Sequence, residues 1–260
     1  MRILVTNDDG INAPGIKTLE KIAYQLAGHD GEVWIVAPAT EKSGVGHCIS
    51  FAAPITISKL ETRRYTVDGN PADCILAGLH YVMKGKCPDL ILSGVNRGNN
   101  SAENALYSGT LGAALEGALQ GIKSIALSQY LGPKNFHIAD PFEASDQHGA
   151  NLIRSILSQK ELSKKDYKTF YNINFPPCPG KEVQGIKVTP QGFRKNSHFT
   201  VEPIETPSMR EFLFVKGGDQ QVSTKPGSDA DANLNGYISV TPMTADLTDY
   251  AELVGLKDIE

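Results

Sequence analysis

The stretch ILVTNDDG at residues 3–10 places a short apolar run directly before a turn-rich acidic segment. Apolar residues then recur at helical spacing until Gly28, at Ile16, Leu19, Ile22, Ala23 and Leu26. A second apolar run, VWIV, follows at 33–36. A strand, a helix and a strand in this order form a βαβ unit, whose crossover connection requires the two strands to be parallel.

The same alternation continues to about residue 157. Runs typical of buried strands lie at 90–92 and 125–127, with weaker strand-like pieces at 54–58 and 65–67, and helical spacing is found over 71–83, 111–119 and about 142–157. We expect residues 93–100 to form a loop, because they are rich in Asn and Gly. The pattern predicts an α/β fold with a doubly wound, mostly parallel sheet.

Beyond about Lys168 the helical spacing disappears. Strand-like segments follow at 170–175, 186–189, 211–215 and 237–240. We therefore divide the chain into a metal- and phosphate-binding core, residues 1–167, and a strand-rich C-terminal extension, residues 168–260, that completes the fold and mediates oligomerisation. Residues 193–209 could be a protruding hairpin or an arm that docks on another subunit. Four aromatic residues would then be buried in a dimer, or else pack on their own core: Phe193, Phe199, Phe212 and Phe214.

Composition excludes several classes of partner. The 260 residues contain 25 Lys and Arg against 29 Asp and Glu, a net charge of -4 without a long basic run, so we expect no nucleic acid polymer. The N-terminal apolar run is too short for a signal peptide, and no run is long enough to cross a membrane, so we expect a cytoplasmic protein. The cysteines lack metal-binding spacing and are expected to be reduced, buried thiols: Cys48, Cys74, Cys87 and Cys178.

Polar side chains follow three of the predicted strands. In a doubly wound sheet, ligands bind outside the carboxyl ends of the strands. The adjacent carboxylates Asp8 and Asp9, with hydroxyl and amide oxygens from the loops at 40–47 and 93–100, would make a hard cation site suited to Mg²⁺, Mn²⁺ or Ca²⁺. The alternative is that Asp8, Asp9 and Gly10 only cap the next helix or form a solvated turn.

A predicted helix start at residues 107–112 combines small and hydroxyl side chains, a pattern typical of an anion-binding site. The alternative is an ordinary N-cap, followed by small residues that allow close helix packing. A cation site and an anion site at one sheet edge together suggest metal-assisted chemistry on a phosphate ester. The sequence lacks G-x-G-x-x-G, the P-loop motif and a G-x-S-x-G nucleophile elbow. A phosphatase that uses an aspartyl nucleophile after its first strand normally carries Asp-x-Asp. The carboxylates of this chain are adjacent, which favours direct attack on phosphorus by metal-bound water.

Several motifs in order resemble the SurE survival-protein family of metal-dependent 5'/3'-nucleotidases. They are RILVTNDDG at 2–10, VAP at 36–38 with SG at 43–44, GNPADC at 69–74, SGVNRG at 93–98, YSGT at 107–110 and GYISVTP at 236–242. The resemblance implies a Rossmann-like core, an extended C-terminal part used in dimerisation, and an acid-phosphatase-like hydrolase that removes phosphate from nucleoside monophosphates.

The resemblance also implies the residues of the site. The metal ligands fall on Asp8, Asp9, Ser43 and Asn96, and the phosphate-binding residues on Asn100, Ser108, Gly109 and Thr110. We expect one divalent cation, Mg²⁺ or Mn²⁺, to activate the attacking water with Asp8 and Asp9 as catalytic ligands, no organic cofactor, and a homodimer or a dimer of dimers. The alternative function is a non-enzymatic nucleotide or metal sensor on the same core.

Four further residues keep two interpretations each. His47 could protonate the leaving oxygen, or be a hydrogen-bonding surface residue. Arg97 could contact the phosphate, or hold its own loop. Asp229 and Asp231 could form a second cation site, although a solvated turn is the simpler interpretation. Compared with the family, Asn replaces Thr at 70, Pro at 99 and Asp at 104, and Leu replaces Val at 111, which affects the expected shape of the substrate pocket.

Overall fold

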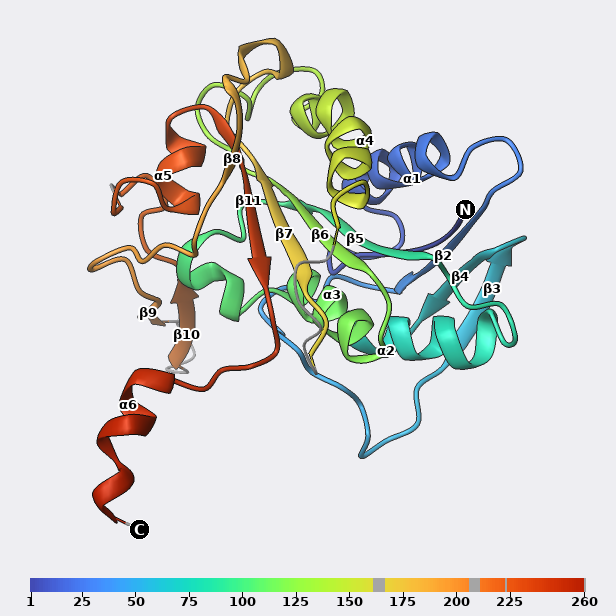
Figure 1. Cartoon of the computed structure of the whole chain (residues 1–260), viewed down its shortest axis with the longest axis horizontal. Coiled ribbons are helices and arrows are strands. Elements are labelled where there is room, and N and C mark those ends of the chain that lie inside the picture. The colour runs from blue at the N-terminus through green and yellow to red at the C-terminus, as the bar shows by residue number, and fades with distance from the viewer. Residues whose placement is uncertain (161–166, 206–210, 223, 260) are drawn as a thin grey trace.

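A nine-stranded sheet forms the centre of the computed structural model (Figure 1), which describes residues 1–160, 167–205, 211–222 and 224–259. The strands lie in the order β3-β4-β2-β1-β5-β6-β7-β11-β8. Their bounds are β1 Arg2–Thr6, β2 Glu32–Pro38, β3 Ile57–Glu61, β4 Arg64–Val67, β5 Leu90–Arg97, β6 Ser124–Gln129, β7 Phe170–Phe175, β8 Gly185–Val188 and β11 Tyr237–Met243. Neighbours from β4 to β7 pair in parallel, whereas β3, β11 and β8 run antiparallel to them. The predicted mostly parallel α/β sheet is therefore confirmed.

Helices cover both faces of this sheet (Figure 1). Helices α1 (Pro14–Ala27) and α4 (Glu143–Leu157) lie on one face, and α2 (Pro71–Ala77) and α3 (Gly109–Leu119) on the other. Strand β1 shows why two layers form: Ile3 and Val5 belong to the apolar core with α1, whereas Leu4 belongs to the core with α2. Successive side chains of a strand point to opposite faces, so a fully apolar strand requires a cover on each side.

Local residues set where these helices begin and end. Helix α1 begins with Pro14 and ends at Gly28, which has a φ of 75°. Helix α3 begins after Ser108, whose Oγ accepts a hydrogen bond from the backbone N–H of Leu111. Helix α2 is shorter than the predicted 71–83, because a π-helical turn, η1 (Gly78–Val82), continues it.

The predicted loop at 93–100 is wrong in its first half, because β5 continues to Arg97. Its register against β6 shifts between Ser93 and Asn96. At Gly94, with a φ of +133°, a Cβ atom would lie 2.2 Å from the carbonyl oxygen of Leu127, so only glycine fits. The polar residues on which the loop prediction is based therefore lie partly in strand β5. The end of this strand borders a hollow.

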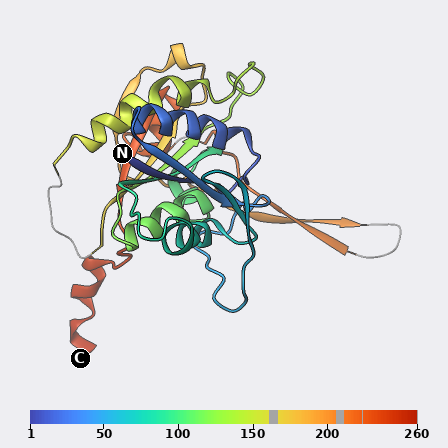
Figure 2. The same ribbon diagram turned by 90° about the vertical axis from the view of Figure 1, so that its right-hand side faces the viewer.

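The C-terminal part contributes to the sheet and also leaves it. Strands β7, β11 and β8 extend one side of the sheet, whereas β9 (Thr200–Glu205) and β10 (Glu211–Lys216) form an antiparallel ribbon that projects from the molecule (Figure 2). The short helix α5 (Asp229–Leu234) packs beside β11, and α6 (Tyr250–Gly255) stands away from the core (Figure 1). The hairpin alternative for 193–209 agrees with the ribbon only in part, because β9 falls within these bounds and β10 lies beyond them; residues 206–209 lie outside the described part.

Two expectations about side chains need correction. The four aromatic residues of this region do not pack on a core of their own, because between 45% and 70% of each is exposed: Phe193, Phe199, Phe212 and Phe214. All four cysteines are free, but only Cys74 and Cys178 are buried, whereas Cys48 and Cys87 lie in loops and are exposed. Among the described helices none is both long and apolar enough to span a membrane.

Candidate active site

The candidate site lies where the carboxyl ends of β1 and β5 meet, at the point where the order of the sheet reverses. A hollow of about 200 Å³ opens there, and five of the eight predicted site residues line it: Asp8, Ser43, Asn96, Asn100 and Ser108. A neighbouring hollow of about 480 Å³ is lined by Asp9, and Ser43 and Arg97 line both. The two remaining residues, Gly109 and Thr110, lie at the start of α3, where Thr110 donates a hydrogen bond to Asp8.

Asp8 is a buried carboxylate with a hydroxyl partner. Only 4% of the residue is exposed, and its Oδ1 accepts a hydrogen bond of 2.5 Å from the Thr110 hydroxyl. The pKa of Asp8 is raised to about 7, chiefly because the carboxyl is buried; the charge of Asp9 adds to this rise, and hydrogen bonds from Thr110 oppose it. A cation beside Asp8 would offset both the burial and the repulsion, so this carboxylate suits a metal ligand.

Asp9 is held from the other strand. Its Oδ2 accepts the backbone N–H of Arg97 at 3.0 Å, which ties the turn after β1 to the end of β5. Burial raises the pKa of Asp9, the backbone hydrogen bond from Arg97 lowers it, and Glu41 raises it. Because β1 ends at Thr6, both carboxylates lie beyond the extended strand, as a shared cation requires. The exposed Arg97 side chain lines both hollows.

The loop after β2 brings Ser43 to the site. Lys42 donates its backbone N–H to the carbonyl of Asp8 at 2.7 Å, and the Ser43 hydroxyl donates to Glu41 Oε1 at 2.8 Å. His47 pairs through Nε2 with Glu116 Oε2 of α3 at 2.7 Å, and this bond lowers the pKa of Glu116. His47 thus fastens the loop, and it is not among the described residues that line the hollow.

The amides of Asn96 and Asn100 are oriented by neighbours. Asn96 Nδ2 donates to the carbonyl of Gly98 at 3.0 Å, which leaves Oδ1 as the atom that could bind a cation. Asn100 Nδ2 donates to Ser128 Oγ at 2.8 Å, and its backbone N–H donates to Asn174 Oδ1 at 2.7 Å. One amide N–H of Asn100 therefore remains for an anion.

These side chains fit an oxygen-seeking divalent cation. The donor set consists of two carboxylates, a hydroxyl and an amide oxygen, which are ligands of Mg²⁺ and Mn²⁺. In the described part of the chain no three His, Cys, Asp or Glu side chains form a metal-binding group, so any cation here would draw on the neutral donors as well. At Gly109, a Cβ atom would lie 2.9 Å from Asp8 Cβ, so glycine lets the start of α3 approach the carboxylate.

Sequence reasoning missed several residues of this hollow. Asn104 enters the sequence analysis only as a departure from a family pattern, and Tyr107 directly precedes the predicted phosphate-binding turn. Asn99 belongs to the polar loop at 93–100 but has no predicted role of its own. Phe199 and Gln220 also line the hollow, but they come from the C-terminal part, far away in the sequence. No local pattern links those two residues to the loops after β1 and β5.

The prediction for Asp229 is wrong, and Asp231 lies in the first turn of α5 and not in a loop. Asp229 is fully buried at the start of α5 and accepts three backbone N–H groups, from Ala102 at 3.0 Å, Gly192 at 2.8 Å and Ala230 at 2.7 Å. Burial raises the pKa of Asp229, whereas these hydrogen bonds lower it. Asp229 is therefore a structural acceptor that joins three segments, and neither a solvated turn nor a cation ligand.

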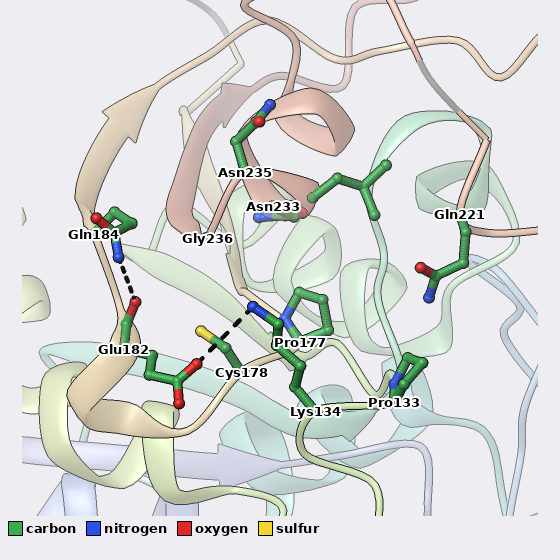
Figure 3. Close-up of a pocket in the computed structure, with 11 residues that line it drawn as sticks. Pro133, Lys134, Pro177, Cys178, Glu182, Gln184, Gln221, Asn233, Asn235 and Gly236 are labelled. Atoms are coloured by element: carbon green, nitrogen blue, oxygen red, sulfur yellow. Dashed lines mark hydrogen bonds and ion pairs between the residues drawn. The ribbon is translucent and has the colours of Figure 1, made fainter.

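A separate hollow of about 480 Å³ lies beside α5 (Figure 3). Lys134 and Glu182 approach within 4.0 Å there, and Gln184 donates to the carbonyl of Glu182 at 3.0 Å. Cys178 and Asn233 also line it, but no predicted site residue does. The smaller hollow at Asp8 is the better candidate, because it gathers the carboxylate, hydroxyl and amide groups at the reversal of the sheet.

Replacement of Thr110 by valine tests its bond to Asp8. We expect the affinity for Mn²⁺ to fall about 10-fold to 100-fold, since partners that orient a metal ligand contribute on that order. Thr18→Val in α1 is the matched control and should leave the affinity unchanged. Unchanged metal affinity with a raised KM would instead assign Thr110 to the phosphate, and a metal titration followed by steady-state kinetics separates the two results.

Comparisons with known proteins agree over most of the chain. The family model described as survival protein SurE matches residues 3–198. The chain is 61% identical to the 5'-nucleotidase SurE of Ruegeria pomeroyi over 248 residues, 95% of each chain, and 60% identical to that of Roseobacter denitrificans over 259 residues, 100% and 99% of the two chains. The crystal structure of the SurE protein from Aquifex aeolicus superposes with a TM-score of 0.82 at 36% identity, covering 100% of this chain and 99% of the other.

Proposed function

The chain belongs to the SurE survival-protein family, and from this we infer that it is a 5'-nucleotidase, a phosphomonoesterase that releases phosphate from nucleoside monophosphates. The observation that carries the inference is about 60% identity to named 5'-nucleotidases over nearly the full length of both chains. The hollow at Asp8 supports it, because carboxylate oxygens lie there beside the start of a helix.

We further propose that Asp8, Asp9, Ser43 and Asn96 hold one divalent cation, Mg²⁺ or Mn²⁺. Such a cation supplies positive charge that offsets the phosphate and lowers the pKa of a nearby water. Thr110 orients the Asp8 carboxylate, and the backbone N–H of Arg97 orients Asp9. The family's dependence on metal and this oxygen-rich donor set support the proposal.

The phosphate group would lie between Asn100 and the start of α3. The Ser108 hydroxyl oxygen already accepts from Leu111, so its proton is free to be donated to a phosphate oxygen. The Gly109 backbone N–H belongs to the first turn of the helix, where intrahelical acceptors are lacking. Together with Asn100, these donors stabilise charge on the nonbridging oxygens while water attacks phosphorus directly.

A phosphate-release assay tests the function. We expect the purified protein to release phosphate from AMP with Mn²⁺ or Mg²⁺, and to stop when a chelator is added. Binding of AMP without phosphate release under all metal conditions would favour the non-enzymatic nucleotide or metal sensor. The same assay with 3'-AMP determines which ester position is preferred.

We also propose a homodimer formed through the β9–β10 ribbon. The ribbon exposes apolar side chains on both strands, at Val201, Ile204, Phe212, Leu213, Phe214 and Val215. An apolar surface of this kind normally marks a contact with another chain. Helix α6 exposes apolar residues as well, which provides a second surface for a dimer or a dimer of dimers: Tyr250, Leu253 and Val254.

Replacement of Phe212 and Phe214 by serine tests this surface. The two side chains lie two residues apart on β10, hence on one face of the ribbon. We expect light scattering at micromolar concentration to show a dimer for the wild type and dissociation of the double variant, with Tyr24→Ser in α1 as the exposed aromatic control. A monomeric wild type would refute the dimer, and a dimeric double variant would move the contact to another surface.

A further inference from the structure

Two aromatic side chains form an open wall of the hollow at Asp8. The rings of Tyr107 and Phe199 meet edge to face, with centroids 4.8 Å apart and planes at 74°. Both residues line the same hollow as Asp8 and Ser108. Tyr107 is 47% exposed and Phe199 45%, so each ring keeps a free surface beside a polar site. Exposed aromatic surface inside a polar hollow suits an apolar part of a ligand.

This pair is held in place from both parts of the chain. Tyr107 directly precedes the N-cap of α3, and its carbonyl accepts the backbone N–H of Gly46 at 2.9 Å. Phe199 directly precedes β9, five residues after Arg194, whose side chain is completely buried. Arg194 contacts Glu103 at 3.3 Å and Asn99 Oδ1 at 2.9 Å. The C-terminal segment that carries Phe199 is therefore anchored to the loop that follows β5.

The amides around the rings are already bonded to the protein. Asn104 Nδ2 donates to Gln220 Oε1 at 2.7 Å, and Gln220 Nε2 donates to the carbonyl of Gly218 at 2.9 Å. The same aromatic pair also borders a second hollow of about 180 Å³, so there is room for a flat ring beyond the phosphate end. The two rings can therefore stack on a base, whereas the amides of Asn104 and Gln220 are already bonded and few polar groups remain to form hydrogen bonds with the edge of a base.

We propose that Tyr107 and Phe199 form the nucleobase subsite of the enzyme and give it a preference for phosphate esters whose leaving group carries an aromatic ring. This inference rests on the proposed function, which places the phosphate at the Asp8 end of the hollow. Stacking on an aromatic side chain tolerates any base, because every base has a π face. Discrimination should thus be strong between nucleotides and sugar phosphates, and weak among the bases.

The test is the ratio of kcat/KM for AMP to kcat/KM for ribose 5-phosphate, measured with saturating Mn²⁺. We expect Tyr107→Leu and Phe199→Leu each to lower this ratio about tenfold, the order of effect of losing one stacking contact. Tyr107→Phe keeps the ring and should keep the ratio. Tyr24→Leu removes an exposed tyrosine from α1 and serves as the matched control.

An unchanged ratio in both leucine variants would overturn the subsite, even if the loss of kcat/KM were large, because equal losses on both esters indicate a structural role. Calorimetric binding of AMP and of ribose 5-phosphate repeats the comparison without turnover. A wild type that releases phosphate from neither ester would refute the proposed function. Weaker binding of AMP to the leucine variants would still support the aromatic subsite in that case, and unchanged binding would refute it.

Discussion

Asp8→Asn is expected to lower kcat for AMP on the order of a thousandfold while leaving the fold intact. The substitution keeps the volume of a side chain that is only 4% exposed but removes its charge. A bound cation contributes several kcal/mol of transition-state stabilisation, which corresponds to about this factor. Circular dichroism and turnover at several Mn²⁺ concentrations are the measurements.

Two further variants define the result. Asp9→Asn should behave similarly, because Asp9 lies beside Asp8 and its pKa is also raised by burial. Asp30→Asn changes a fully exposed carboxylate in the turn after α1 and should retain normal turnover. If either Asp8→Asn or Asp9→Asn retained near-normal turnover at limiting metal, the assignment of that residue as a ligand would be wrong.

The sheet was predictable because buried parallel strands appear in the sequence as short, fully apolar runs separated by helical spacing. The end of β5 was not predictable in this way, since Ser93 to Arg97 are mostly polar yet pair with β6. Their pairing depends on the absence of a side chain at Gly94 next to the carbonyl of Leu127, which no periodicity reveals. Polar residues that line a site at the end of a strand have the same sequence pattern as a loop, so the pattern alone predicts a loop.

The candidate site likewise contains residues that the sequence predicts and contacts that it does not. Asp8 and Ser43 follow predicted strands, Asn96 follows the predicted apolar run at 90–92, and Ser108 begins a predicted helix, so the fold topology brings them to one edge. The partner of Thr110 was not predictable, because its bond to Asp8 joins residues 102 positions apart. The segment that carries Phe199 is anchored by the buried Arg194, which contacts the Asn99 loop, and sequence spacing does not encode this contact between two parts of the chain.

Asp8 also gives the metal-free protein a characteristic dependence of stability on pH. The carboxyl has a pKa of about 7 in the folded chain and an ordinary value of 3.8. Between about pH 4 and pH 7 the folded state therefore keeps a proton that the unfolded state has released. Because the folded state binds more protons, the free energy of unfolding falls as the pH rises, by up to about 1.4 kcal/mol per pH unit from this group, and levels off above its folded pKa.

A comparison with Asp8→Asn isolates this contribution, because the amide is neutral throughout. In chelator, the two proteins should have similar stability near pH 4, and the variant should be more stable above pH 7 by about 4 kcal/mol. Urea unfolding at pH 4.5, 6 and 8 measures the difference. Added Mn²⁺ should restore the wild type at pH 8 and leave the variant unchanged, since a ligand stabilises only the state that binds it. A difference that stays flat with pH would mean that the Asp8 charge is compensated by the protein itself, and the main physical reason to place a cation at this carboxylate would be lost.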